Sequence, residues 1–478
     1  MAEQDFSAQA GNIEEFVISA NTSDRAVDMS NGVVDFKYYE SVLSNGITAT
    51  ATIVETGYTD EGADVKGGIL DGLPIRGGER TDIRVMDAQP VHNELNFTDE
   101  GLYINRVRGA DPGTQKDLYF IDFVSKDFLS NDKTRVVSRY DGKISANVGS
   151  ILKNVLKTSK EVEADETAFE YNFIGNDRKP FYVCTWLASK SAPDKAVGAT
   201  AGYFFYQTYD GFKFKSIDKL LGQNPVKKYI YNNTGQTPPG YDGNIDTYSI
   251  ERDIDLHQNL TLGSYNNRSF FFDLLVHQYI GRSFSIAQQQ GKVENAGNPN
   301  DFIVVADQFI DSPSRVMSHI MDYGTLPTGK NADQQLKQWR ERKTESNYNA
   351  PEVMVQSIMR YNQLFTIQVN ITIPGDFSIR AGDMIECDFK YLEEGEPDAT
   401  NSQSGGLYMV AHVCHNLTPK KTFTSLTLVR DSFGKKGGFD NSPTATAAQS
   451  VTPGGPLVPD VDGQNRNPSA SILRLRGV

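Results

Sequence analysis

The imidazole and thiol groups near residue 412 are the side chains with the clearest potential for metal chemistry. His412, Cys414 and His415 lie within one short run, and Cys387 lies in an earlier apolar run. Zinc favours such ligands, but a tetrahedral site needs four that converge. The surrounding pattern predicts a strand, on which His412 and Cys414 share one face and His415 takes the other. We therefore expect packed or hydrogen-bonded strand residues and predict no metal site.

Paired carboxylates offer a second chemistry, because acid–base hydrolysis uses two of them. Asp253 and Asp255 form such a pair, but the chain has 61 Asp and Glu residues and pairs arise by chance. We favour a solvated strand face. Aromatic runs at 203–206 and 270–272 have the side chains of a ligand site, although core or subunit contacts are the expected use. No catalytic or cofactor-binding residue is predicted.

Composition and motifs exclude several classes of protein. The 478 residues carry 47 Lys and Arg against 61 Asp and Glu, a net charge of −14, which argues against general nucleic-acid binding. The Lys227-Lys228 pair is too short to form a nucleic-acid patch. No Walker A loop, dinucleotide fingerprint, His-Glu-x-x-His or nucleophile elbow is present. Three cysteines, without a visible secretory signal, indicate assembly in a reducing cytoplasm.

The elements that must position these side chains are mostly strands. Alternating runs predict strands at 33–40 and 47–55, joined at Asn45-Gly46, and at 81–86, 102–108 and 118–124. Apolar spacing predicts a helix over 145–158. Further along we predict the following strands and helices. The strands are 181–187, 202–209, 212–217, 246–262, 353–360, 365–373, 384–389, 407–414 and 423–430, and the helices are 270–279, a helix opened by Ser312-Pro313, and a solvated helix over 333–345.

These elements predict a β-rich α+β, multidomain chain with two antiparallel β-barrel domains and α+β structure between them. The expected domains are a barrel at 1–124, an α+β domain at 125–245, a second barrel at 246–433 with a helical insertion at about 264–345, and a Gly/Pro-rich extended tail at 434–478. The tail ends in Ile472-Leu473-Arg474-Leu475-Arg476, which is either a frayed terminus or an arm that docks on a neighbour.

Several motifs, in order along the chain, are shared with one family. They are Phe36 to Val42, Leu73 to Glu79, Phe120 to Ser125, Arg139 to Ser145, Gly202 to Tyr206, Asp210 to Phe214, Ile373 to Gly375, Ala381 to Asp383, Gly406 to Val410 with His415, and Phe423 to Leu426. Over residues 30 to 433 the chain resembles the baseplate central hub proteins of contractile-tailed, T-even-like myophages, including cyanophages. The second barrel also resembles spike proteins of type VI secretion systems.

The resemblance implies a structural virion protein that catalyses no reaction and needs no cofactor. Such hubs are homotrimers with two tube-type barrels per subunit, so six barrels surround a DNA channel with pseudo-six-fold symmetry. This geometry adapts the hexameric tail tube to the trimeric central spike. The implied partners are tube, spike and baseplate wedge proteins, with DNA sliding through unbound, and the implied location is the tail baseplate of the virion, after assembly in the host cytoplasm.

Two points stay open at the level of sequence. The acidic composition suits a negative channel wall, which is a hypothesis about where the charges lie. The alternative functions are a spike or hub of a related contractile injection system, or a β-rich hydrolase or carbohydrate-binding protein. No lysozyme-like or peptidase segment is visible after the second barrel.

Overall fold

The computed structural model describes most of the chain between residues 8 and 435. It describes residues 8–435 except 22, 56–72, 74, 90–91, 113–116, 195–199, 233–236, 253–254, 275–276, 289–292, 299–306, 323–332, 335, 338–349, 391–400 and 402. The predicted tail beyond residue 435 and most of the predicted helix at 333–345 therefore lie outside the described residues.

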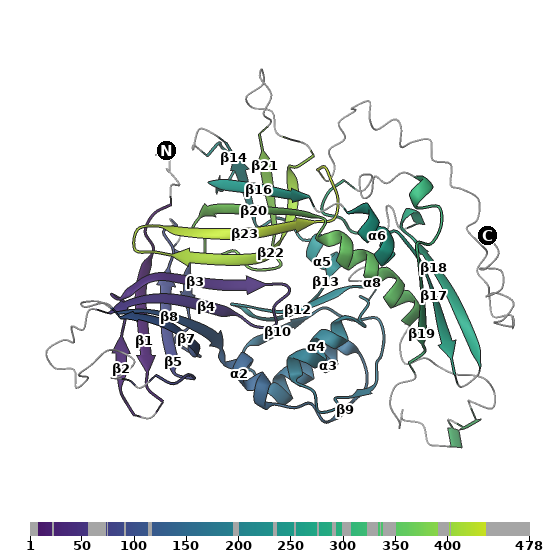
Figure 1. Ribbon diagram of the computed structural model, residues 1–478, viewed down its shortest axis with the longest axis horizontal. Helices are drawn as coiled ribbons and strands as arrows, with labels where there is room; N and C mark the ends of the chain where they lie inside the picture. The colour runs from purple at the N-terminus through teal and green to yellow at the C-terminus, as the bar shows by residue number, and fades with distance from the viewer. Residues whose placement is uncertain are drawn as a thin grey trace.

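Eight antiparallel strands form one continuous sheet, which we call the wall. In spatial order they are β16 (Thr247–Arg252), β20 (Ile367–Pro374), β23 (Thr422–Arg430), β22 (Gly406–Leu417), β3 (Val33–Ser41), β4 (Thr48–Glu55), β8 (Asp117–Ser125) and β7 (Leu102–Pro112). Figure 1 shows most of them stacked from β16 down to β8. The first four come from the C-terminal part of the chain and the last four from the N-terminal part, and the two groups meet where β22 pairs with β3.

Further strands extend the sheet at both ends. β5 (Arg80–Met86) follows β7 and pairs with β1 (Asn12–Ser19) and β6 (Glu94–Asn96), and β2 (Ala26–Asp28) pairs with β1. From β22 the sheet also continues into β21 (Met384–Phe389), β14 (Lys227–Tyr231) and β15 (Gly243–Asn244). The N-terminal strands and the C-terminal strands each enclose an apolar core. Among the described residues, the strand pairings do not close into a ring.

A middle unit with a third apolar core lies beside the wall. It contains α2 (Lys126–Lys133), α3 (Ile144–Ser150), the π-helix η1 (Ile151–Leu156), α4 (Pro180–Ala188), α5 (Ile217–Leu221), and two small sheets. The sheets are β10 (Glu161–Ala164), β13 (Gly211–Ser216) and β12 (Tyr203–Thr208), and the pair β9 (Arg139–Tyr140) with β11 (Phe173–Ile174). The predicted helix at 145–158 is confirmed as α3 with η1.

A smaller module lies between β16 and β20 in the sequence. It contains α6 (Leu256–Leu262), the sheet β18 (Gln278–Ser285), β17 (Asn266–Asp273) and β19 (Arg315–Ile320), two 3-10 turns, η2 (Ile286–Gln288) and η4 (Asp307–Phe309), and α8 (Ala350–Leu364). Figure 1 places its sheet at the right of the molecule, beside α8.

Three predicted strands were wrong, because all or part of each segment forms a helix. Residues 181–187 form α4, where Pro180 occupies the first turn and the buried Phe181, Cys184 and Leu187 recur every three residues. Residues 353–360 lie within α8. The predicted strand at 246–262 ends at Arg252 as β16, and α6 follows.

Two predicted helices were wrong in the opposite sense. Residues 270–279 belong to β17 and β18, and the segment opened by Ser312-Pro313 continues into β19. In β17 Phe271 is fully buried while Phe270 and Phe272 are half-buried, which is strand alternation. Short apolar runs fit either period, and here the parallel pairing of β17 with β19 decides the outcome. The predicted strands of the wall, in contrast, are confirmed.

A buried ion cluster joins the small module to the rest of the chain. The guanidinium of Arg360 in α8 is 1% exposed and lies 2.7 Å from Asp218 Oδ1 in α5 and 3.0 Å from Asp431 Oδ2 after β23. Asp218 also accepts hydrogen bonds from Thr200. Three segments that are distant in sequence therefore meet at one cation.

We predict that Arg360→Met lowers the free energy of unfolding by about 3–5 kcal/mol, because it keeps the side-chain volume and leaves two buried carboxylates uncompensated. Urea denaturation followed by circular dichroism measures this loss. Arg84→Met, which removes an exposed ion pair with Glu94, is the matched control and leaves the transition nearly unchanged. Equal effects from the two variants would show that the cluster does not join the units.

Candidate functional site

One face of the wall carries aligned rows of mostly polar side chains. The register places one row straight across all eight strands, with each residue opposite the next. This row consists of Thr247, Thr372, Ser425, Cys414, Tyr39, Thr48, Val124 and Tyr103. A second row crosses the C-terminal half and reaches β3, through Ser249, Asn370, Thr427, His412 and Ser41. Strand alternation puts both rows on the face opposite the apolar cores.

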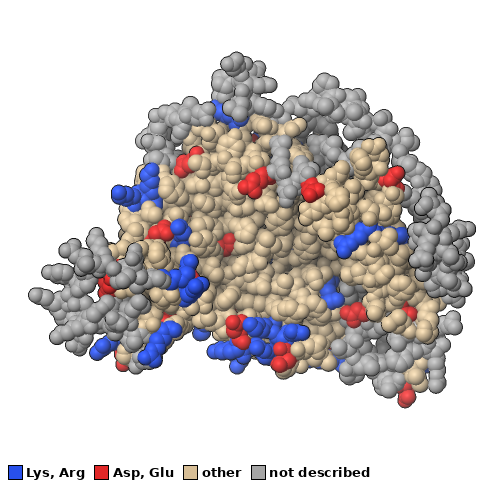
Figure 2. Space-filling model, in the orientation of Figure 1, with Lys and Arg blue, Asp and Glu red and all other residues tan. Residues whose placement is uncertain are grey.

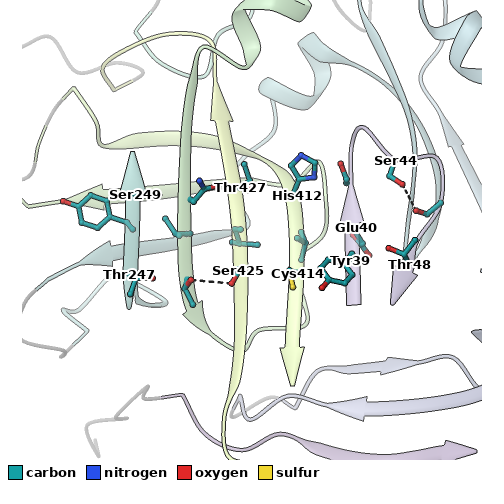
Figure 3. Close-up of a pocket in the computed structure, with 18 residues that line it drawn as sticks. Tyr39, Glu40, Ser44, Thr48, Thr247, Ser249, His412, Cys414, Ser425 and Thr427 are labelled. Atoms are coloured by element: carbon teal, nitrogen blue, oxygen red, sulfur yellow. Dashed lines mark hydrogen bonds between the residues drawn. The ribbon is translucent and has the colours of Figure 1, made fainter. Parts of the chain in front are cut away.

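The centre of this face is hollowed into a cavity of about 880 Å³. Serine and threonine are the most frequent residues of its lining, which also includes His412, Cys414 and two tyrosines (Figure 3). The hydroxyls are those of Ser41, Ser44, Thr48, Thr247, Ser249, Thr372, Ser425 and Thr427. Some bond across strands, since the Thr427 hydroxyl donates to Asn370 Oδ1 at 2.9 Å. Glu40 is the single Asp, Glu, Lys or Arg in the lining, and it is 2% exposed.

Two ion pairs lie elsewhere on this face of β3, β7 and β8, and Arg106 of β7 is a further exposed cation opposite Asp122. Lys37 Nζ lies 2.9 Å from Asp35, and Arg108 lies 2.6 Å from Asp122 on the neighbouring strand. Exposed ion pairs contribute little stability, but the two opposite charges of each pair offset each other's electric field at a distance. The wall therefore combines hydroxyl, amide and thiol groups with charges that are mostly paired, which suits contact with a polyanion without binding it.

The side chains considered for zinc do not converge. His412 and Cys414 line the cavity, while His415 points into the core on the opposite face and Cys387 is buried in the core around β21. Within the described ranges, no group of three or more His, Cys, Asp or Glu side chains is placed to hold a metal.

The other residues considered as functional candidates in the sequence take part in hydrogen bonds, ion pairs or core packing. Asp255 accepts a hydrogen bond from Gln258 N at the start of α6, and Asp253 lies outside the described residues. Lys227 and Lys228 pair with Asp376 and Glu386. The aromatic run at 203–206 is buried in β12.

Glu40 is a buried carboxylate that sequence analysis did not identify as a functional residue. It lies on β3 with its carboxylate on the core side, where it accepts hydrogen bonds from Tyr38 Oη at 2.9 Å, Tyr209 N at 2.7 Å and Ala381 N at 2.9 Å. Tyr209 belongs to the turn after β12 and Ala381 to the loop before β21. Burial raises the pKa of Glu40, and nearby Arg380 opposes that rise. One carboxylate thus ties together the two halves of the wall and the middle unit.

His415 lies at the same seam, opposite Tyr38 in the pairing of β22 with β3. Its ring stacks on Tyr38, Nδ1 lies 3.0 Å from Thr424 Oγ1, and Nε2 lies 3.2 Å from the Ile379 carbonyl oxygen. Complete burial, with the positive Arg380 nearby, lowers the pKa of His415 to about 3. The imidazole is therefore neutral at physiological pH, and protonating it opposes folding.

We predict that His415 makes the protein sensitive to acid. A folded pKa near 3, below the ordinary value of 6.5, means that its contribution to stability is complete above pH 6.5 and is lost as the pH falls toward 3. The loss is about 1.4 kcal/mol per pH unit over that window. Urea unfolding at several pH values measures it. His415→Gln removes this slope, whereas His412→Gln on the wall leaves most of it; an unchanged slope in His415→Gln would contradict the assignment.

Comparison with known proteins gives one relative by sequence. No family model matches the chain. The chain is 21% identical over 442 residues to the probable baseplate hub protein gp334 of Vibrio phage KVP40, covering 88% of this chain and 96% of that protein. The chain is a relative of a phage baseplate hub protein. The resemblance expected from the motifs is thereby confirmed.

Solved structures of tail proteins are similar over most of the chain. The 43 kDa tail protein of prophage MuSo2 from Shewanella oneidensis is 7% identical with a TM-score of 0.47, covering 87% of this chain and 98% of that chain. A tail protein from Neisseria meningitidis MC58 is 10% identical with a TM-score of 0.46, covering 87% and 97%. No helix among the described residues of this hub relative is long and apolar enough to span a membrane.

Proposed function

We propose that this chain is the structural baseplate hub of a phage contractile tail, and that three copies close their walls around a channel for DNA. The observation that carries the proposal is the cross-strand row that runs through eight strands with an uncharged, hydroxyl-rich cavity at its centre. The relative from the Vibrio phage places the protein in the tail baseplate of a virion.

The wall has the internal repetition that a trimer needs to meet a hexamer. It divides at the contact of β22 with β3 into two groups of four antiparallel strands. Three copies would present six such groups around one axis, so a three-fold hub would offer pseudo-six-fold symmetry to a hexameric tail tube and three-fold symmetry to a central spike. Each group would be the channel face of one tube-type barrel.

The two edges of the wall are suited to pairing between subunits. Within the described residues β16 pairs with β20 alone, and β7 beyond Ile104 pairs with β8 alone. The Thr372 carbonyl oxygen accepts a hydrogen bond from Asp246 N, so the backbone groups of Thr372 point toward β16. The residues of β16 opposite Thr372, Asn370 and Gln368 therefore face β20, and by alternation the N–H groups of Tyr248, Ile250 and Arg252 point away from it. An unpaired row of this kind invites another strand, and closure into a ring removes the edge.

The uncharged cavity modifies the hypothesis of a negative channel wall. If this face lines the channel, DNA passes over hydroxyl and amide groups, and the ion pairs of Lys37 and Arg108 add no net charge. Without clustered Lys and Arg the wall releases no counterions from the phosphates, so the DNA is not held. The net charge of −14 then resides mainly on other surfaces.

The proposed domain assignment keeps the boundaries expected from the sequence. We propose a first tube-type barrel at 1–124, a middle domain at 125–245, a second barrel at 246–433 with its inserted module, and a tail at 434–478 that reaches a neighbour in the baseplate. Tail tube, central spike and wedge proteins are the proposed partners, and the hub catalyses no reaction. A core around β5 supports the first domain. The core around β21 also takes in β12, α5 and β14 of the middle domain, and the third core is shared by the middle domain and the inserted module.

We predict that the purified protein has a mass of three times 53.0 kDa, or 159 kDa, by light scattering during gel filtration. Ile250→Pro removes one outward N–H from β16 and is expected to give a folded monomer, because proline is tolerated on edge strands whose N–H faces solvent. Ile250→Ala also shortens the side chain but keeps the N–H, and it stays trimeric. A wild-type monomer both alone and with the candidate central spike would contradict the proposal.

A further inference from the structure

The end of the middle unit carries a group of exposed cationic and apolar side chains, which we call the basic tip. Figure 2 shows Lys and Arg gathered along the lower edge of the molecule, where Figure 1 places α2 and α4. The basic tip consists of Lys133, Arg135, Val137, Arg178, Lys179 and Tyr182, and all six are exposed. The proposed function assigns it no role.

A tight turn holds the centre of the basic tip in place. Asn176 and Asp177 adopt left-handed backbone conformations, with φ of 51° and 56°, which Asn and Asp tolerate better than most residues. The turn closes through a hydrogen bond from Arg178 N to the Gly175 carbonyl oxygen at 3.1 Å. Val136 N in turn donates to the Arg178 carbonyl oxygen at 2.8 Å, so the backbone just before Val137 is fixed against Arg178. A preformed surface loses little conformational entropy on binding.

The charges of the basic tip are not balanced locally. Lys179 pairs with Asp132 at 2.6 Å, and Asp177 is the other exposed carboxylate of the turn. In the described part of the chain, no carboxylate lies within ion-pair distance of Lys133, Arg135 or Arg178. The Arg135 guanidinium instead donates to the carbonyl oxygens of Asp132 and Thr134, both at 2.9 Å, which holds its charge in position. The tip is therefore a positive site on a chain of net charge −14.

An apolar centre distinguishes this surface from a simple cationic patch. Val137 is 65% exposed and Tyr182 is 55% exposed, and the Arg178 guanidinium lies 5.4 Å from the centre of the Tyr182 ring. Exposed aromatic and arginine side chains with an apolar neighbour are typical of the centres of protein interfaces. Phosphate backbones need the cations but make no use of an exposed valine.

We propose that the basic tip docks an acidic protein segment that places an apolar side chain against Val137 and Tyr182. The cations around the centre steer and orient the acidic segment, and the apolar contact gives the complex its lifetime. Charge complementarity and the exposed apolar centre together select a protein over a nucleic acid.

The test uses the full-length protein and two labelled peptides, an oligoglutamate and a glutamate-rich peptide of equal charge that contains phenylalanine. We expect the phenylalanine peptide to bind about tenfold more tightly by fluorescence anisotropy. Val137→Ser with Tyr182→Ala removes that advantage and leaves oligoglutamate binding unchanged. Arg135→Glu with Arg178→Glu weakens both peptides by about tenfold or more.

The matched control reverses two exposed cations elsewhere, Lys420→Glu with Lys421→Glu in the turn between β22 and β23. This control variant binds both peptides as the wild type does if the basic tip is the peptide-binding site. Equal losses in the control would overturn the proposal, as would a phenylalanine advantage that survives Tyr182→Ala with Val137→Ser. Duplex DNA that binds the tip more tightly than either peptide at the same ionic strength would make it a nucleic-acid surface instead.

Discussion

The buried carboxylate of Glu40 holds the two halves of the wall and the middle unit together through the hydrogen bonds that it accepts. Glu40 lies on β3, the strand that joins the N-terminal half of the wall to β22 of the C-terminal half. A buried acceptor that loses its donors incurs the full cost of desolvation, so the turn at Tyr209 and the loop at Ala381 are held in register with β3. The ring of His415, kept neutral by burial, packs against the same seam.

The seam explains why two apolar cores support one polar face. Each half of the wall buries alternate side chains in its own core, and the pairing of β22 with β3 aligns the remaining side chains into common rows. A shift of one residue at this pairing would turn half of the hydroxyl groups inward. The eight-stranded face is therefore a product of both halves, and neither half presents it alone.

Much of the wall was predictable from sequence, because alternation in long strands such as 47–55 and 365–373 is a strong local signal. The strand alternation of His412, Cys414 and His415 also predicted their opposite faces. The module between β16 and β20 was not predictable, since its runs at 270–272 and 316–321 fit either period and long-range pairing decides them. Glu40 and Arg360 could not be found in the sequence, where nothing separates them from surface charges; their partners lie far along the chain.

The central claim is that the polar face of the wall points inward in a three-fold assembly. Electron cryomicroscopy of the purified protein tests this most directly, because it shows the number of copies and the side of the sheet that meets the axis. We predict three copies around an open channel, with the row from Thr247 to Tyr103 lining it. A closed assembly in which this row faces the outer surface, or is buried against another protein, would contradict the account.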